Sequence, residues 1–276
     1  YQLGVFIFKS YVFKKYRGNF LRLNKSYPHK RDFIRLIQKL IDKKIIYPRN
    51  DFSNTVFDIQ HKPRPFAEEI ICTIDPFSYV SHLSAMQHYN FCSAKKGVLF
   101  FSSLPLRMWR NQASKIMEKE CNGIENWMIY YNNRLPYLRI IKVNRIDDIV
   151  VKQYSNKNLG SFIGEKIRVA TPERTFLDML RKPDLCGGMN FVLSVYRTHA
   201  LKYLNAILKE IDTHGSQVEK IRAGYILEEI CKIKDPLIAS WLKFAQRGGS
   251  RKLDPSNDFS SIYSERWCLS LNVQNL

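Results

Sequence analysis

The stretch Val169–Gly188, VATPERTFLDMLRKPDLCGG, joins an extended segment to a helix and then to a pair of glycines. We expect the helix to begin after Thr171, because its side-chain oxygen can accept hydrogen bonds from the free amides of the first turn. Pro172 suits the first helical position, and Glu173 opposes the positive end of the helix dipole. The stretch therefore predicts a capped helix that follows directly on a strand.

The remainder of this stretch also has a structural explanation. Arg174 and Asp178 are four residues apart and can pair across one helical turn. Pro183 ends the helix, and Gly187 and Gly188 permit a turn with positive φ. The apolar stripe expected to be buried consists of Phe176, Leu177 and Leu180. From these residues alone, the stretch is a structural joint and not an active site.

Outward from this joint, the chain places strands mainly before it and helices after it. Strand patterns occur at 97–101, 126–131, 138–143, 148–154 and, near the end, 265–273. Helices are predicted at 77–89, 106–120, 172–181, 189–213, 217–232 and 236–246. This order predicts an α+β fold in which a central sheet is followed by C-terminal helices.

Two prolines, Pro63 and Pro65, prevent regular structure and separate an N-terminal domain, residues 1–66, from a larger domain, residues 67–276. Residues 1–66 hold 15 Lys or Arg and 4 Asp or Glu, a net charge of +11. The remaining residues hold 29 and 21, a net charge of +8. This asymmetry favours a polyanionic partner for the first domain, and its folded pattern favours nucleic acid over a membrane.

Within the first domain, residues 27–45 predict a helix with Ser26 as its cap and Pro28 in its first turn. One side of this helix is apolar: Phe33, Ile34, Leu36, Ile37, Leu40 and Ile41. Two short β segments follow, 44–48 and 55–60, joined by the turn RNDFSN at 49–54. An earlier helix is expected around Val5–Lys15. A helix followed by a hairpin is the second half of a winged helix.

The side of this helix opposite the apolar residues holds the DNA-binding candidates. Arg31, Arg35 and Gln38 are residue types that bind guanine and adenine edges, and Lys30, Lys39 and Arg49 are expected to contact phosphates. The full set of DNA-binding candidates is Tyr27, Lys30, Arg31, Arg35, Gln38, Lys39, Arg49 and Asn50. An ordinary solvated amphipathic helix is the alternative. A second basic patch on helix 106–120 consists of Arg107, Arg110, Lys115 and Lys119. Three interpretations of this patch stay open: contact with flanking DNA, contact with RNA connected with the toxin, and a plain solvated surface.

The sequence contains none of the motifs that phosphoryl transfer or nucleotide binding requires. The chain has no Asp-x-Asp, no Asp-x-Glu and no Gly-Lys-Ser/Thr, so it lacks the signatures of a nucleotidyltransferase and of a P-loop. His82 and His88 are badly spaced for one metal, and Ser81 beside His82 is not expected to form a nucleophile pair. We therefore expect neither enzymatic activity, nor a metal, nor a cofactor.

The spacing of the cysteines and the length of the apolar runs predict the cellular compartment of the protein. The six cysteines are widely scattered, which favours reduced thiols and a cytoplasmic protein. No apolar run approaches the ~18 residues of a membrane span. The aromatic opening YQLGVFIFKSYVFKK is interpreted as a helix of the fold and not as a signal peptide.

Four stretches in order resemble the AbiEi antitoxin family. Residues 169–188 resemble its signature helix and Gly-Gly turn, and VSHLSAMQHYNF at 80–91 is similar to the helix that opens its C-terminal domain. RAGYILEEI at 222–230 is similar to its Arg-Leu-Gly-Tyr motif, with Ala223 replacing the usual leucine, and ERWCLSLNV resembles its closing Arg-Trp strand. The resemblance covers about Ser26 to Val273, although the segment before the recognition helix is unusually short. The motif positions carried over are Thr171, Pro172, Glu173, Arg174, Asp178, Gly187, Gly188, Arg222, Tyr225, Glu228, Arg266 and Trp267.

The resemblance implies a bacterial antitoxin of a type IV toxin–antitoxin system. In that family a winged helix binds inverted repeats in operator DNA and represses its own operon. The C-terminal domain counteracts a nucleotidyltransferase-like toxin, in many members without a stable complex. Two other hypotheses stay open: a stand-alone regulator whose C-terminal domain binds a ligand or dimerises, and a module that sequesters a toxin by direct contact.

Overall fold

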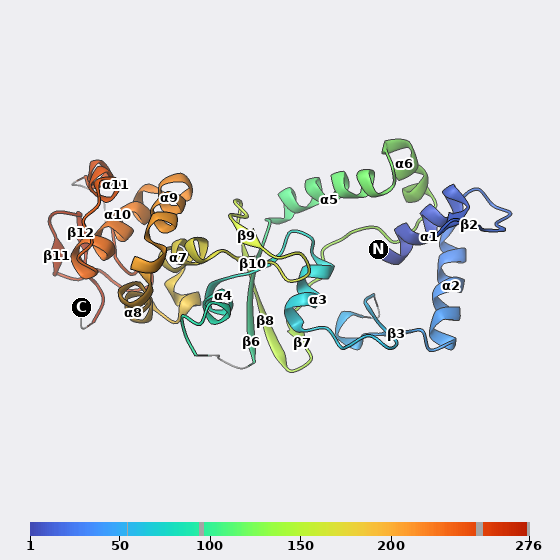
Figure 1. Ribbon diagram of the computed structural model, residues 1–276, viewed down its shortest axis with the longest axis horizontal. Coiled ribbons are helices and arrows are strands. Elements are labelled where there is room, and N and C mark those ends of the chain that lie inside the picture. Colours follow the sequence, from blue (N-terminus) through green and yellow to red (C-terminus); the bar gives the residue numbers. More distant parts are fainter. Residues whose placement is uncertain (54, 94–96, 247–250, 275–276) are drawn as a thin grey trace. The chain divides into compact units, whose positions relative to one another are not determined.

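A computed structural model describes residues 1–53, 55–93, 97–246 and 251–274 (Figure 1). The chain is mixed α+β and divides into two compact units. The first unit combines residues 1–66 with 104–147, and the second combines 67–103 with 148–276. The chain thus crosses between units at Pro65–Ala67, where the prolines predict a boundary, but segment 104–147 returns to the first unit. Asn54, part of the predicted turn, lies outside the described residues.

The first unit begins with α1 (Gln2–Phe13), a tight hairpin of β1 (Lys15–Tyr16) and β2 (Asn19–Phe20), and α2 (Lys30–Asp42). A second antiparallel hairpin follows, formed by β3 (Ile46–Pro48) and β4 (Phe57–Ile59). The returning segment adds α5 (Leu106–Glu120) and α6 (Ile124–Asn132). The helix predicted around Val5–Lys15 is therefore present as α1. It ends at Phe13 because Lys14 adopts a left-handed backbone with φ 48°.

Aromatic packing explains why 104–147 belongs with the first unit. The ring of Phe8 in α1 meets Tyr130 of α6 edge-on at 5.2 Å, and Tyr130 is fully buried. A Cβ at Gly4 would overlap the Tyr130 hydroxyl, so the two helices pack closely there. The strand predicted at 126–131 is thus wrong, because its aromatic residues form a helix face, and 138–143 is not a strand either.

The second unit begins with α3 (Ala67–Ile74), β5 (Tyr79–Val80), α4 (His82–His88) and β6 (Val98–Ser103). β8 (Ile149–Ser155), β9 (Phe162–Ile163) and β10 (Val169–Ala170) complete its strands before the helices. Together with β7 (Arg145–Ile146), these strands form a mixed six-stranded sheet in the order β7-β8-β6-β5-β10-β9. The strands predicted at 97–101 and 148–154 are confirmed. The helix predicted at 77–89 begins only at His82, because 79–80 pair as β5.

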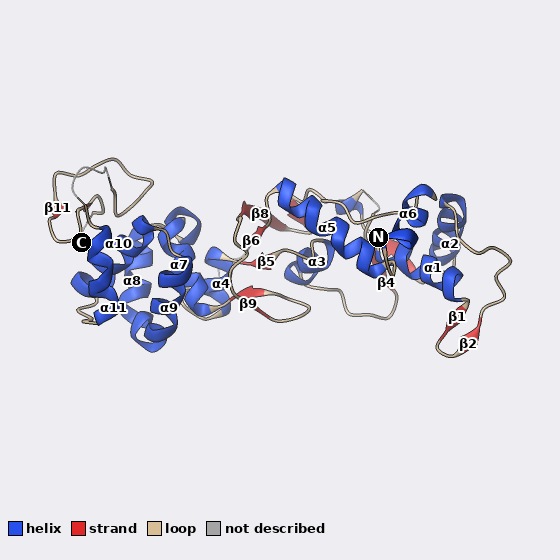
Figure 2. Ribbon diagram, turned by 90° about the horizontal axis from the view of Figure 1, so that it is seen from above, coloured by secondary structure: helices blue, strands red, loops and turns tan. Residues whose placement is uncertain are grey.

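Helices follow the sheet, as the sequence predicts (Figure 2). They are α7 (Pro172–Arg181), α8 (Met189–His199), α9 (Leu204–His214), α10 (Gln217–Tyr225) and α11 (Pro236–Ser240). The single helix predicted over 189–213 is divided by a 3₁₀ turn at Ala200–Tyr203, and α10 continues as a π-helical turn, Ile226–Ile230. Near the end, β11 (Tyr263–Ser264) pairs with β12 (Leu269–Ser270).

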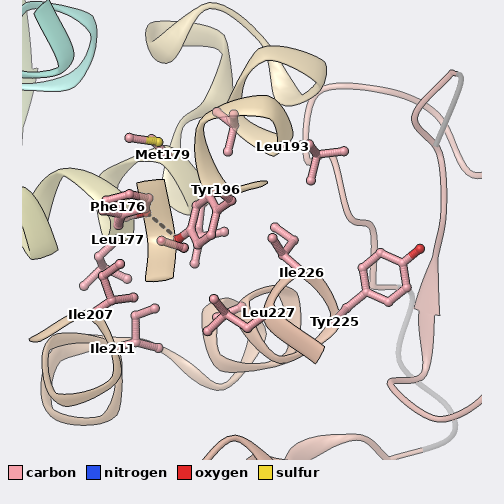
Figure 3. Packing of buried hydrophobic residues seen from close by; sticks show 14 of the residues in the cluster. Phe176, Leu177, Met179, Leu193, Tyr196, Ile207, Ile211, Tyr225, Ile226 and Leu227 are labelled. Carbon is pink, nitrogen blue, oxygen red and sulfur yellow. Dashed lines mark hydrogen bonds between the residues drawn. The ribbon is translucent and has the colours of Figure 1, made fainter. Parts of the chain in front are cut away.

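The core of the second unit lies among α7, α8, α9 and α10 (Figure 3). Phe176 and Leu177 are fully buried, as the stripe on α7 predicts, and the Tyr196 hydroxyl donates to the Phe176 carbonyl at 2.9 Å. Tyr196 packs edge-on against the Phe176 ring at 4.8 Å. Because aromatic and aliphatic side chains of four helices interdigitate here, α7 is fixed on several sides. Among the described residues, no helix has the length and the apolar character required to cross a membrane.

Candidate nucleic-acid interface

Basic charge is concentrated in the first unit more strongly than the linear sequence indicates. Residues 1–66 and 104–147 together hold 23 Lys or Arg and 8 Asp or Glu, a net charge of +15. The second unit holds 21 and 17, a net charge of +4, although it is the longer of the two. The first unit therefore carries most of the positive charge of the chain. A field of one sign attracts a polyanion and raises its association rate.

The beginning of α2 is fixed by a buried carboxylate. Asp32, only 6% exposed, accepts hydrogen bonds from the His29 amide at 3.0 Å and from the Lys25 ammonium at 2.9 Å. The Lys25 hydrogen bond and the His29 amide hold the pKa of Asp32 below its ordinary value. The helix thus begins at Lys30, and the predicted cap at Ser26 is wrong. A carboxylate at the third position of the first turn gives α2 a defined start.

The outward face of α2 holds Arg31, Arg35, Gln38 and Lys39, all exposed, while Ile37 is buried on the other side. Arg35 lies 3.5 Å from an Asp32 oxygen, and the Gln38 amide donates to Asp42 at 2.8 Å. These intrahelical contacts are solvent-exposed for the Arg35 and Gln38 side chains, so a DNA base or phosphate can replace them at little cost. The predicted face therefore exists as an accessible polar surface.

Three further candidates occupy different positions. Tyr27 is 39% exposed, and its ring stacks on Phe8 with centroids 6.1 Å apart, so it anchors the segment before α2 to α1. Lys30 is exposed, and its amide donates to the Asn133 carbonyl at 3.0 Å, which ties the start of α2 to the end of α6. Asn50 is exposed at the first position of a short 3₁₀ turn, Asn50–Phe52.

Arg49 is not a phosphate contact, contrary to the sequence prediction. Its side chain is 4% exposed and pairs with Asp51 at 2.8 Å, Asp58 at 3.1 Å and Asp147 at 2.9 Å. The Asp51 hydrogen bond and the neighbouring carboxylates raise the pKa of Arg49 further, despite its burial. These groups line a cavity of about 400 Å³ in which Arg49, Arg64 and Arg145 balance the three carboxylates. The cavity is close to neutral and does not select an anion.

The second basic patch lies on α5, which belongs to the first unit. Arg107, Arg110, Lys115 and Lys119 are all exposed. The same helix buries Trp109, Ala113 and Met117, which recur every four residues. The four cations are therefore exposed on the same unit as α2.

The signature helix α7 of the second unit has the predicted start. The Thr171 oxygen accepts from the Arg174 amide at 3.4 Å, Pro172 is the first helical residue, and Glu173 is half-buried in the first turn. At the other end of the motif, Gly187 has φ 94° and Gly188 has φ 91°, and Gly188 directly precedes α8. Both glycines therefore occupy backbone conformations that other residues rarely adopt.

Arg174 lies in a buried network of charges. It is 0% exposed, and its Nε lies 3.1 Å from Asp178 Oδ1, which confirms the pair predicted from the spacing. Its Nη1 donates to Glu210 of α9 at 3.4 Å, and its Nη2 donates to the Asn158 carbonyl at 3.3 Å. Burial lowers the pKa of Arg174, but Asp178 and the other negative partners outweigh it, so the pKa is raised and the guanidinium stays charged.

The remaining motif residues also form the framework of the second unit. Arg222 donates to the Leu180 carbonyl at 3.0 Å and to the Lys252 carbonyl at 2.8 Å, which joins α10 to α7 and to the chain before β11. Glu228 accepts two hydrogen bonds from Arg266 at 2.7 Å and one from the Trp267 indole at 2.9 Å. Tyr225 is 8% exposed and belongs to the hydrophobic core.

Ser81 and His82 lie closer to each other than the sequence predicts. Ser81 Oγ lies 2.8 Å from His82 Nδ1, because Ser81 is extended and His82 has φ 50°, so the two are not helical neighbours. Ser102 donates to Ser81 Oγ at 2.8 Å. Both members of the pair are buried, at 0% and 1% exposed, and burial lowers the pKa of His82. The pair is thus a buried polar contact with no access for a substrate.

The comparisons with known proteins do not identify the chain: no protein-family model matches it, and no curated protein matches it. Within the described residues, no group of three or more His, Cys, Asp or Glu is placed to hold a metal ion. The geometry itself is therefore the basis for a functional assignment.

Proposed function

We propose that the protein binds double-stranded DNA through its first unit and represses the operon that encodes it. The observation that carries this proposal is the net charge of +15 on that unit, combined with the exposed Arg31, Arg35, Gln38 and Lys39 on one side of α2. Bidentate side chains on an exposed helix suit the major groove, and the cations around them suit phosphates. In this proposal the first unit is a winged-helix variant in which α5 and α6 complete the core.

We further propose that the second unit counteracts a nucleotidyltransferase-like toxin, as its resemblance to the AbiEi family implies. Supporting this, four stretches that carry the resemblance supply the core and the ion pairs of the same unit: 80–91, 169–188, 222–230 and 265–273. Several of these residues are framework residues: Arg174, Asp178 and Trp267 are buried, whereas Arg266 is half exposed. Because half of the motif residues are buried, the resemblance concerns the fold at least as much as a contact surface.

DNA binding is tested with the full chain. A labelled 40-bp duplex from directly upstream of the coding sequence is titrated by fluorescence anisotropy between 50 and 300 mM salt, beside a shuffled duplex. We expect preference for the upstream duplex and a slope of log K against log salt of about −0.9 for each phosphate contacted. The absence of binding to either duplex would refute the DNA-binding proposal.

Toxin neutralisation is tested by co-expression with the adjacent open reading frame. We expect that frame to encode a nucleotidyltransferase whose toxicity is suppressed by this protein. Pull-down separates the alternatives, because a sequestering module forms a stable complex and a type IV antitoxin protects without one. A toxic neighbour that this protein does not suppress would leave a stand-alone regulator as the function.

A further inference from the structure

The β1–β2 hairpin is an exposed basic element to which the proposed contacts of α2 with DNA assign no role. Lys15 pairs with Phe20 and Tyr16 with Asn19, and Arg17 and Gly18 form the two-residue turn between them. Arg17 has φ 46° and Gly18 has φ 82°, the two positive values that a tight type I′ turn requires. The Leu21 amide donates to the Lys14 carbonyl at 2.8 Å and closes the base of the hairpin. The hairpin therefore has a defined register and a narrow tip.

Along this hairpin, cationic side chains alternate with aromatic side chains, and the aromatic rings are exposed to solvent. Tyr16 is 44% exposed and Phe20 is 77% exposed. The Lys15 ammonium lies 4.6 Å from the Phe20 ring centroid, and the Arg17 guanidinium lies 5.4 Å from that of Tyr16. A phenylalanine this exposed leaves a large apolar area in water, so the hairpin presents a surface suited to a partner with both charged and apolar parts.

No carboxylate in the neighbouring sequence neutralises this charge. Residues 1–31 contain eight Lys or Arg and no Asp or Glu, and four of the cations flank or form the hairpin: Lys14, Lys15, Arg17 and Arg22. The β3–β4 hairpin after α2 differs, because Arg49 is buried among Asp51, Asp58 and Asp147. Of these two hairpins, β1–β2 has the charge that a DNA backbone attracts.

The hairpin and α2 are both anchored on α1. Lys14, the residue directly after α1, is followed by β1, and Tyr27, just before α2, stacks on Phe8 of α1 at 6.1 Å. Figure 2 shows the hairpin projecting from the end of α1. One helix therefore supports both elements within the first unit.

We infer that the β1–β2 hairpin acts as the wing of the DNA-binding unit and contacts the duplex beside the segment bound by α2. Its tip presents Arg17 to the minor groove, whose width of about 6 Å and negative potential favour arginine. Lys14, Lys15 and Arg22 face phosphates on either side, and Phe20 lies against the sugars. This inference rests on the proposed DNA-binding function and adds a second contact region to it.

The test compares full-length variants on the upstream 40-bp duplex. Lys15→Ala with Arg17→Asn removes two cations, and asparagine tolerates the left-handed backbone at position 17. Lys157→Ala with Lys166→Ala is the charge-matched control, since both lysines are exposed in the second unit. We expect the hairpin variant to reduce the salt slope by about 0.9 through the Lys15 phosphate contact, roughly 8-fold in affinity at 0.1 M salt, with a further loss of affinity from the Arg17 minor-groove contact. The control should match the wild type.

Two further measurements complete the test. Phe20→Ala should weaken binding without changing the salt slope, and hydroxyl-radical footprints should lose protection at the flank alone in the Lys15/Arg17 variant. Unchanged slope and footprint, with a wild-type melting temperature, would overturn the wing assignment and leave DNA binding by α2 intact. Loss of binding to a single-stranded RNA with duplex binding unaffected would also overturn it. A wild type that binds no DNA overturns both proposals.

Discussion

Arg174→Ala tests the structural role of the signature helix. The substitution leaves Asp178, 1% exposed, and Glu210, 6% exposed, without their shared cation. Removal of one partner from a buried ion pair costs about 3–5 kcal/mol, because the remaining charge is desolvated and unpaired. Arg181 lies 3.7 Å from Asp178 and compensates in part, so we expect about 3 kcal/mol. For a unit of this size that is a fall in melting temperature of about 6–12 °C.

Differential scanning calorimetry on the full chain measures this loss, with Arg197→Ala as the control. Arg197 is exposed on α8 of the same unit, so its removal should change stability by under about 0.5 kcal/mol. The double variant Arg174→Ala/Asp178→Ala should be less destabilised than the sum of the single variants, since it removes one of the orphaned charges. DNA binding, which we assign to the other unit, should persist below the transition.

One result would contradict the structural role of Arg174. If Arg174→Ala kept the wild-type melting temperature and yet failed to protect cells from the toxin, Arg174 would be a functional contact. The reasoning from its burial and its three partners would then be refuted. A joint loss of stability and of protection supports the structural role.

Two other substitutions separate structure from binding. Arg49→Ala should lower the free energy of unfolding by about 2–3 kcal/mol, because it leaves carboxylates without their cation, and should leave the salt slope of DNA binding unchanged. Lys39→Ala should reduce that slope by about 1 with little effect on stability. Calorimetry measures the stability and anisotropy titrations measure the slope; a reduced slope for Arg49→Ala would contradict its burial. Because burial lowers the pKa of His82 below its ordinary value of 6.5, the unfolded state takes up the proton first, so wild-type stability falls as pH decreases below 6.5. His82→Asn should show a shallower decline in urea midpoint between pH 7.5 and 5, and identical slopes would refute this contribution.

Local sequence signals predict the joint between β10 and α7 well. A capping threonine, a proline in the first position and an (i, i+4) ion pair act within one or two turns, so their outcome depends little on the rest of the chain. The apolar stripe on α7 is equally local, and the structure buries it. The same local signals predict the exposed face of α2 correctly but indicate Ser26, and not His29, as the cap of that helix.

Contacts between distant parts of the sequence explain the errors. The aromatic residues of 126–131 favour a strand by propensity, but the packing of Tyr130 on Phe8 stabilises a helix. The sequence around Arg49 predicts an exposed cation, but Asp147 from the returning segment 104–147 pairs with Arg49 and completes its burial. The return of 104–147 also explains why the second basic patch lies on the first unit, which no composition count along the chain could show.

The central claim is that the outward face of α2 binds base edges. Competition anisotropy measures it most directly, as the ratio of affinities for the upstream and shuffled duplexes with wild type, Arg31→Ala, Arg35→Ala and Lys39→Ala. We predict that each arginine variant loses about 1–3 kcal/mol on the upstream duplex alone, so the ratio falls, while Lys39→Ala weakens both duplexes equally and keeps the ratio. An equal loss on both duplexes for all three variants, or an unchanged ratio in the arginine variants, would contradict the claim.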